Sequence, residues 1–362
     1  KKYEDIFLNA MQGLRIERFD VMPRATEHIQ EQIQMVEMLE EKGYTYTIPD
    51  DGIYMDTSLV EDYGKLMWAN YKKRLADLNA GERVDIWGKR NPTDFALWKF
   101  SPRNEKRQME RDSPWGIWFP GWHIECSAMA SKYLGEQFDI HHGGTDHITV
   151  HHSNEITQSE CSFWHKPWVK YWLHNEFLQV DGGKMSKSLG NIYSLDDIKA
   201  KGYSPLDLRY FYFKAQYSNF LNFTRDALEQ AKNERLGLIK KIRNLTPTEW
   251  DDDFQEKIYA ALWDNLNTPK LLSDIHLALL HPTQQTLSLL KELEDKVLKV
   301  WLFDPVIEEN IEIPEEVLHL AEARKQAKTD KNYALADQLR AEILEKWWEV
   351  KDSKDGFELV KK

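Results

Sequence analysis

Apolar residues follow first a helical and then a strand-like periodicity near the start of the chain. Between residues 25 and 42 they recur every three or four positions, which predicts an amphipathic helix ending at Gly43. Two runs of aromatic and β-branched residues follow at 44–48 and 53–55 and predict a β-hairpin. We expect the Asp-Gly pair between them to supply the positive φ of the turn. Residues 25–113 are therefore predicted to form an α/β insertion.

The middle of the chain combines short strand-like runs with many histidines. Strand-like runs at 138–140 and 168–172 flank a helical segment at 150–162, an order typical of a parallel sheet. Eight of the twelve histidines lie between His123 and His174. This concentration of titratable rings predicts that the chemistry of the protein is found here.

Beyond Pro205 the apolar spacing is helical almost to the end of the chain. We expect a helical bundle over 205–303 and a small module over 304–362, with loop residues near 303–305 between them. The amphipathic stretches that predict helices are 226–245, 254–266, 270–280, 284–302, 315–328 and 333–348.

Composition narrows the class of protein. A chain of 362 residues with 12% aromatic residues has enough apolar area for several packed units. Its two cysteines, Cys126 and Cys161, exclude a disulfide framework and favour a reducing, cytoplasmic setting. No apolar run is long enough to cross a bilayer. The net charge of -12 argues against nonspecific binding of nucleic acid, so an RNA partner would need local basic patches.

One segment, 182–191, reads as a mobile cationic loop for phosphate. Lys184 and Lys187 stand three apart, with Met185, Ser186 and Ser188 between and after them and glycines on both sides. Paired ammonium groups can stabilise the charge that develops on pyrophosphate as it leaves ATP. A surface turn with ordinary lysines is the alternative for a lone Lys-x-x-Lys, but the full string favours ATP binding.

The loop matches the signature of class I aminoacyl-tRNA synthetases. Three further markers, at 120–127, 151–156 and 171–175, make the chain from Arg24 onward resemble the cysteinyl-tRNA synthetase family. The resemblance implies a partial class I Rossmann-like nucleotide-binding domain over 114–204. It also implies activation of L-cysteine by ATP with Mg²⁺, followed by transfer to tRNA(Cys).

The second marker predicts a metal site. His151 and Glu155 are four residues apart, so on a helix they share one face, and Cys126 can supply a thiolate from a separate strand end. Zn²⁺ suits this mixed set best. All three match ligands of the family, in which one zinc ion binds the thiolate of the substrate. Serine differs from cysteine too little in shape for a pocket to reject it, whereas its neutral hydroxyl is a poor metal ligand.

Other matches concern the cysteine pocket. Trp122 corresponds to a family residue that forms a wall of the pocket, and Trp172 and His174 correspond to positions near cysteine and the adenylate. Core packing explains either tryptophan equally well.

The stretch after the run at 138–140 matches the adenosine site of the family. Gly143 and Gly144 permit close approach of the backbone, and Asp146 can accept hydrogen bonds from ribose hydroxyls. A glycine pair alone would be weak support for nucleotide binding.

The family pattern begins with a strand, a zinc-binding cysteine and a His-x-Gly-His motif, none of which occurs here. Residues 1–24 would be a remnant of the first half of the catalytic fold, and we expect the missing N-terminal half to be required for a complete site. Two alternatives to a cysteine-tRNA ligase stay open. One is a related ligase that joins cysteine to an aminosugar, and the other is an inactive, truncated zinc- or RNA-binding module. The presence of 304–362 favours tRNA.

Overall fold

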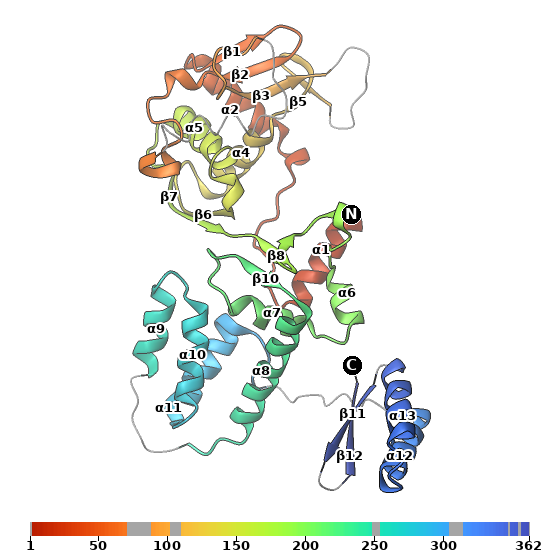
Figure 1. The fold of residues 1–362 in the computed structure, drawn as a ribbon. Coiled ribbons are helices and arrows are strands. Elements are labelled where there is room, and N and C mark those ends of the chain that lie inside the picture. Colours follow the sequence, from red (N-terminus) through yellow and green to blue (C-terminus); the bar gives the residue numbers. More distant parts are fainter. Residues whose placement is uncertain are drawn as a thin grey trace.

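The computed structural model describes residues 2–70, 88–101, 110–247, 254–303, 314–346, 348–353 and 356–361. Figure 1 shows an α/β part at the top, a helical bundle below it and a small part next to the C-terminus. This arrangement agrees with the predicted α/β class followed by a bundle. Within the predicted insertion, 71–87 and 102–109 lie outside the described residues, as does most of the predicted loop before the last part.

The top of the molecule carries an antiparallel sheet in the order β1-β2-β3-β5-β4. The predicted hairpin is confirmed, but Asp50 has the positive φ, at 60°. Gly52 is required for another reason, because a Cβ there would lie 2.4 Å from the carbonyl oxygen of Trp98. The elements are α2 (Ile29–Glu41), β1 (Thr45–Ile48), β2 (Gly52–Met55), β3 (Phe95–Phe100), β4 (Arg111–Ser113) and β5 (Gly116–Pro120).

Two parallel strands, β6 (Phe138–Gly144) and β7 (Val169–Asn175), pair as the sequence predicts. The helix between them, α5 (His151–Phe163), is buried at twelve of its thirteen residues and packs against α2 and α4 (Trp122–Leu134). Because many of its side chains are polar, their burial requires partners. Such partners include the Tyr63 hydroxyl, which donates to Asn154 at 2.7 Å.

Below this, a three-stranded sheet in the order β10-β8-β9 joins the α/β part to the bundle (Figure 1). One hydrophobic core runs from Val180 to Leu302 through the bundle. The elements are α1 (Lys2–Gly13), β8 (Leu178–Val180), β9 (Gly183–Lys184), α6 (Leu195–Ala200), α7 (Pro205–Phe213), β10 (Leu221–Phe223), α8 (Arg225–Arg243), α9 (Phe254–Trp263), α10 (Thr268–Ala278) and α11 (Gln284–Leu293).

The prediction of a single helix over 284–302 is wrong at its end. The α-helix ends at Leu293, one π turn follows, and Lys299 takes a positive φ of 53°. The carboxylate of Glu294 accepts the backbone N–H groups of Val300 and Trp301, which satisfies the chain after it has left the helix. The spacing of apolar residues cannot predict this carboxylate cap, because Glu294 is a polar residue.

The last part holds two helices, α12 (Glu315–Thr329) and α13 (Tyr333–Glu345), and a hairpin of β11 (Trp348–Ser353) and β12 (Gly356–Lys361). The predicted helix over 333–348 therefore ends early, and the hairpin was not predicted. Trp348 is buried against Val317 and Ala321 of α12. Among the described residues, no helix is long and apolar enough to span a membrane.

A buried ion pair ties α7 to α8. Arg235 donates to Asp207 at 2.9 Å and to the carbonyl of Val300 at 2.9 Å, and both charged side chains are buried. We expect Asp207→Ala to lower the free energy of unfolding by about 3–5 kcal/mol, because Arg235 is left as a buried unpaired charge. Urea denaturation measures this. The control is Glu234→Ala, which breaks the half-exposed pair with Lys214 and should cost no more than about 1 kcal/mol. Equal losses in the two variants would contradict the prediction.

Candidate active site

Helices α4 and α5 bring three possible metal ligands together. The donor atoms of Cys126, His151 and Glu155 all lie within 4.8 Å of one another. His151 and Glu155 share one face of α5, as predicted from their spacing. The expected position of Cys126 at a strand end is wrong, because it lies in the second turn of α4, and the packing of α4 on α5 produces the meeting.

Glu155 is a buried carboxylate between histidines. Its side chain is fully buried, and neither oxygen has a hydrogen bond of good angular geometry. Yet His151 Nε2 lies 3.4 Å from Oε1 and His141 Nε2 lies 3.2 Å from Oε2. Burial acts to raise the pKa of Glu155, but these two histidines lower it to about 2. The site therefore holds a buried negative charge, which suits a cation.

The thiol of Cys126 shows the complementary effect. Burial, together with the negative charges of Glu155 and Glu125, raises its pKa to about 12, so without a cation the thiol keeps its proton. A divalent ion next to the sulfur reverses this preference, because it stabilises the thiolate. Sulfur, imidazole nitrogen and carboxylate oxygen are the donor types that zinc accepts. The residues present therefore fit a zinc ion.

Aromatic rings surround the ligands. Trp122 is 59% exposed and its ring centroid lies 4.3 Å from that of His151, so it is not a core tryptophan. Trp172 stacks on His174 with 5° between the ring planes, and His174 Nε2 lies 2.8 Å from His152 Nδ1. All three predicted pocket residues thus contact a histidine of α5, the helix that carries His151 and Glu155.

Sequence reasoning missed three histidines that belong to this group. His123 contacts His151, and His141 and His152 form a second possible metal group with Glu155. The concentration of histidines in this stretch was visible in the sequence. The contacts themselves depend on how α4 and β6 pack on α5, which no local pattern gives.

The predicted nucleotide residues lie at the carboxyl end of β6. A Cβ on Gly143 would lie 2.6 Å from the His152 ring, and one on Gly144 would lie 2.4 Å from Asp146 Oδ1. Within this chain the two glycines therefore make room for His152 and for the carboxylate of Asp146. Whether they also approach adenosine stays a prediction.

The predicted phosphate loop is held by the side chain of Asn191, and its lysines are exposed to solvent. Asn191 accepts the Ser186 N–H at 2.8 Å and donates to the Lys184 carbonyl at 3.0 Å, which closes the loop. Lys184 and Lys187 are exposed, and neither has an acidic partner among the described residues. Ser186 and Ser188 hydroxyls lie 3.1 Å apart, and the side chain of Met185 packs against the core of the bundle. The loop is anchored with both charges free.

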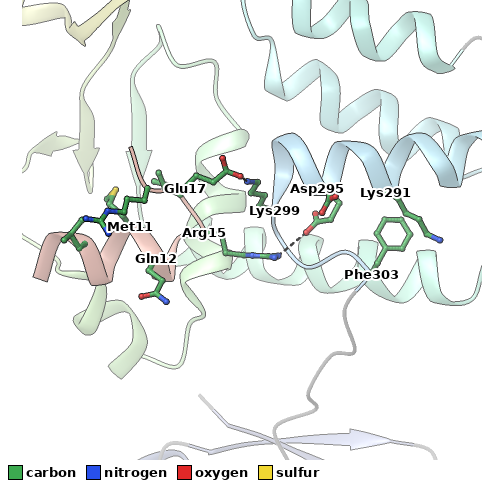
Figure 2. Close-up of a pocket in the computed structure, with 12 residues that line it drawn as sticks. Met11, Gln12, Arg15, Glu17, Lys291, Asp295, Lys299 and Phe303 are labelled. Carbon is green, nitrogen blue, oxygen red and sulfur yellow. Dashed lines mark hydrogen bonds and ion pairs between the residues drawn. The ribbon is translucent and has the colours of Figure 1, made fainter. Parts of the chain in front are cut away.

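A pocket of about 1040 Å³ lies elsewhere, between the end of α1 and the end of α11 (Figure 2). None of the predicted site residues lines it. Its charged side chains pair across the gap, Arg15 with Glu294 at 3.6 Å and Lys299 with Glu17. We interpret this pocket as a gap in the packing of α1 against the bundle.

Comparison with known proteins bears on this site. The family model described as "tRNA synthetases class I (C) catalytic domain" matches residues 1–233. A cysteine-tRNA ligase of Treponema denticola is 41% identical over 94% of the chain and 75% of its own length. The chain belongs to the cysteine-tRNA ligase family. Family members of Burkholderia lata (41% identical) and Thermococcus gammatolerans (38%) match 99% and 98% of the chain, and 76% and 79% of their own lengths.

Membership in the cysteine-tRNA ligase family makes the chain an aminoacyl-tRNA synthetase that charges tRNA with cysteine. The fold agrees. Methionyl-tRNA synthetase of Mycobacterium tuberculosis, solved in complex with methionyl-adenylate, superposes with a TM-score of 0.54 at 15% identity. The superposition covers 76% of this chain and 68% of that one. The Rossmann-like class I fold predicted from the sequence is thereby confirmed.

Proposed function

We propose that the chain selects cysteine through one zinc ion held by Cys126, His151 and Glu155. The observation that supports this most directly is the convergence of three donor atoms within 4.8 Å around a buried carboxylate without good hydrogen bonds. When bound there, zinc supplies a Lewis acid that prefers a thiolate to a neutral hydroxyl. Such a preference distinguishes cysteine from serine.

The residues around the ligands would shape the amino-acid pocket. Trp122, exposed beside His151, offers an apolar wall that excludes water from the thiol. Trp172 and His174, stacked on each other, would form the side nearer the adenylate. His174 shares a hydrogen bond with His152, which fixes its ring orientation.

ATP would lie between β6 and the phosphate loop. We propose that Lys184 and Lys187, with Met185, Ser186 and Ser188 as the loop backbone, bind the phosphates and stabilise the leaving pyrophosphate. Mg²⁺ would accompany the nucleotide. Gly143, Gly144 and Asp146, at the carboxyl end of β6, would receive the adenosine.

tRNA(Cys) would extend over the helical parts. We assign the bundle, 205–303, to contacts with the body of the tRNA and the module, 304–362, to the anticodon. The lysines near the end of α8, Lys240 and Lys241, offer local positive charge on a chain whose overall charge is negative. Residues 1–24 would be a remnant of the first half of the catalytic fold, 25–113 its insertion and 114–204 its second half. The cytoplasm is the proposed place of action, because charged tRNA is used there.

Cysteine-dependent exchange of pyrophosphate into ATP tests the proposal. We expect exchange with cysteine, at most a trace with serine, and about one zinc ion per chain. The sequence predicts a requirement for an N-terminal His-x-Gly-His segment, so the assay is run with and without that segment of a relative. Exchange that persists after zinc is removed with a chelator, or equal exchange with serine, would refute the role of the metal.

A further inference from the structure

Two histidines outside the proposed ligand set lie directly against the ligands. His123 follows Trp122 on α4, and its Nδ1 lies 2.9 Å from Nδ1 of His151. His141 lies on β6, and its Nε2 is 3.2 Å from Oε2 of Glu155. The ligand atoms that face each other are different ones, His151 Nε2 and Glu155 Oε1 at 3.4 Å. His123 therefore contacts the nitrogen of His151 that does not face Glu155, and His141 contacts the oxygen of Glu155 that does not face His151. We call His123 and His141 the outer histidines.

The contact between His123 and His151 fixes where the hydrogens are. A neutral imidazole carries a hydrogen on one nitrogen and a lone pair on the other. If His151 offers the lone pair of Nε2 to an ion, its hydrogen must be on Nδ1. Nδ1 of His123 is then the acceptor at 2.9 Å, and His123 carries its own hydrogen on Nε2. One hydrogen bond thus selects the tautomer of both rings.

The contact between His141 and Glu155 involves the carboxylate oxygen that does not face His151. Glu155 is fully buried, so solvent does not reach its carboxylate. His152 is too far to serve, with Nε2 at 3.9 Å from Oε2, whereas His141 Nε2 is within reach at 3.2 Å. His141 Nε2 is thus the nearest donor to Oε2, although the contact does not have the angle of a good hydrogen bond here. A hydrogen donated from His141 would engage Oε2 and leave Oε1 for coordination.

We propose that His123 and His141 are positioning residues for the metal ligands. His123 accepts the Nδ1 hydrogen of His151, and His141 donates its Nε2 hydrogen to Glu155. This inference rests on the ligand set of the proposed function. Outer partners of metal-bound histidines are often carboxylates. Imidazole partners orient the ligands without adding negative charge to a site that already has Cys126 and Glu155.

Both outer rings are held by groups other than the ligands. The edge of Phe95 packs on His123 with 5.5 Å between centroids, and Gln158 donates to the His123 carbonyl at 2.6 Å. The ring of His141 packs between Phe138 and Trp172, at 6.0 and 4.8 Å. These ring contacts restrict the orientations of both histidines.

Equilibrium zinc binding by the full chain, in competition with a chromogenic chelator, tests the proposal. We expect His123→Phe and His141→Phe to weaken binding by about 10- to 100-fold, the usual effect of removing such partners. His123→Asn keeps an acceptor at the position of Nδ1 and His141→Gln keeps a donor at the position of Nε2, so both should stay within a few-fold of the wild type. The cobalt(II) absorption bands should shift in the Phe variants and be restored in the Asn and Gln variants. His165→Phe, at an exposed histidine beyond α5, is the control and should change neither.

The outcomes separate the possible failures. Unchanged affinity in both Phe variants, or an equal loss in the Phe variants and in the His123→Asn and His141→Gln variants, would overturn the proposal, because hydrogen bonding would then have no role. Two zinc ions per wild-type chain would make His141 and His152 ligands with Glu155 and overturn the role of His141. Zinc that His151→Ala binds as tightly as the wild type would instead refute the ligand set of the proposed function.

Discussion

Cys126→Ser is expected to reduce the zinc content of the chain from about one ion to almost none. The thiolate is the only sulfur ligand of the proposed set, and a serine hydroxyl keeps its proton in a buried site next to Glu155. Cysteine-dependent pyrophosphate exchange should be lost with the metal. Metal analysis of the purified variant and the exchange assay measure the two effects.

Cys161→Ser is the matched control, since it removes the second cysteine of the chain. Cys161 is buried in the hydrophobic core formed with α2 and β3, and it is not part of either possible metal group. We expect this variant to lose some stability and to keep its zinc. If the two serine variants contained the same amount of zinc, Cys126 would not be a ligand.

Lys187→Ala should lower the rate of exchange by about 100- to 1,000-fold, as the loss of one group that stabilises a developing charge usually does. Lys187 is exposed in a loop that the side chains of Asn191 and Ser186 hold, so its removal disturbs no packing. Zinc content and thermal stability should therefore stay at wild-type values. The exchange assay and metal analysis are run under the conditions in which the wild-type chain is active.

Lys199→Ala is the control, because it removes one positive charge outside the phosphate loop. Lys199 is an exposed lysine of α6 whose ion pair with Asp196, at 3.2 Å, is a surface contact. Its removal should leave exchange unchanged. An equal decrease in both lysine variants would mean that the loop contributes general positive charge and has no specific role in ATP activation.

Local patterns predicted much of this structure. The hairpin of β1 and β2, and the strand-helix-strand order around α5, were predicted correctly because β-branched and aromatic runs, turn residues and helical spacing are local features of the sequence. The spacing of His151 and Glu155 was correct for the same reason. Both ligands are on one helix, so their meeting needs no knowledge of the tertiary fold.

The remaining features depend on contacts between distant segments. Cys126 lies in a helix and reaches the site only because α4 packs on α5. His123 and His141 approach the ligands from separate elements, so the spacing of residues along the chain could not pair them with His151 and Glu155. The end of α11 was predicted wrongly because the Glu294 carboxylate binds the backbone that follows the helix. Strand β11 was missed because the packing of Trp348 on α12 is a contact between distant segments.

The burial of α5 has a consequence for local unfolding. Its backbone opens only when neighbouring helices separate, whereas α1 has no buried residue and can open at little cost in free energy. Hydrogen exchange should therefore be slowest along the helix that carries His151 and Glu155. His151 and Glu155 would therefore keep their relative positions while less buried elements such as α1 unfold locally.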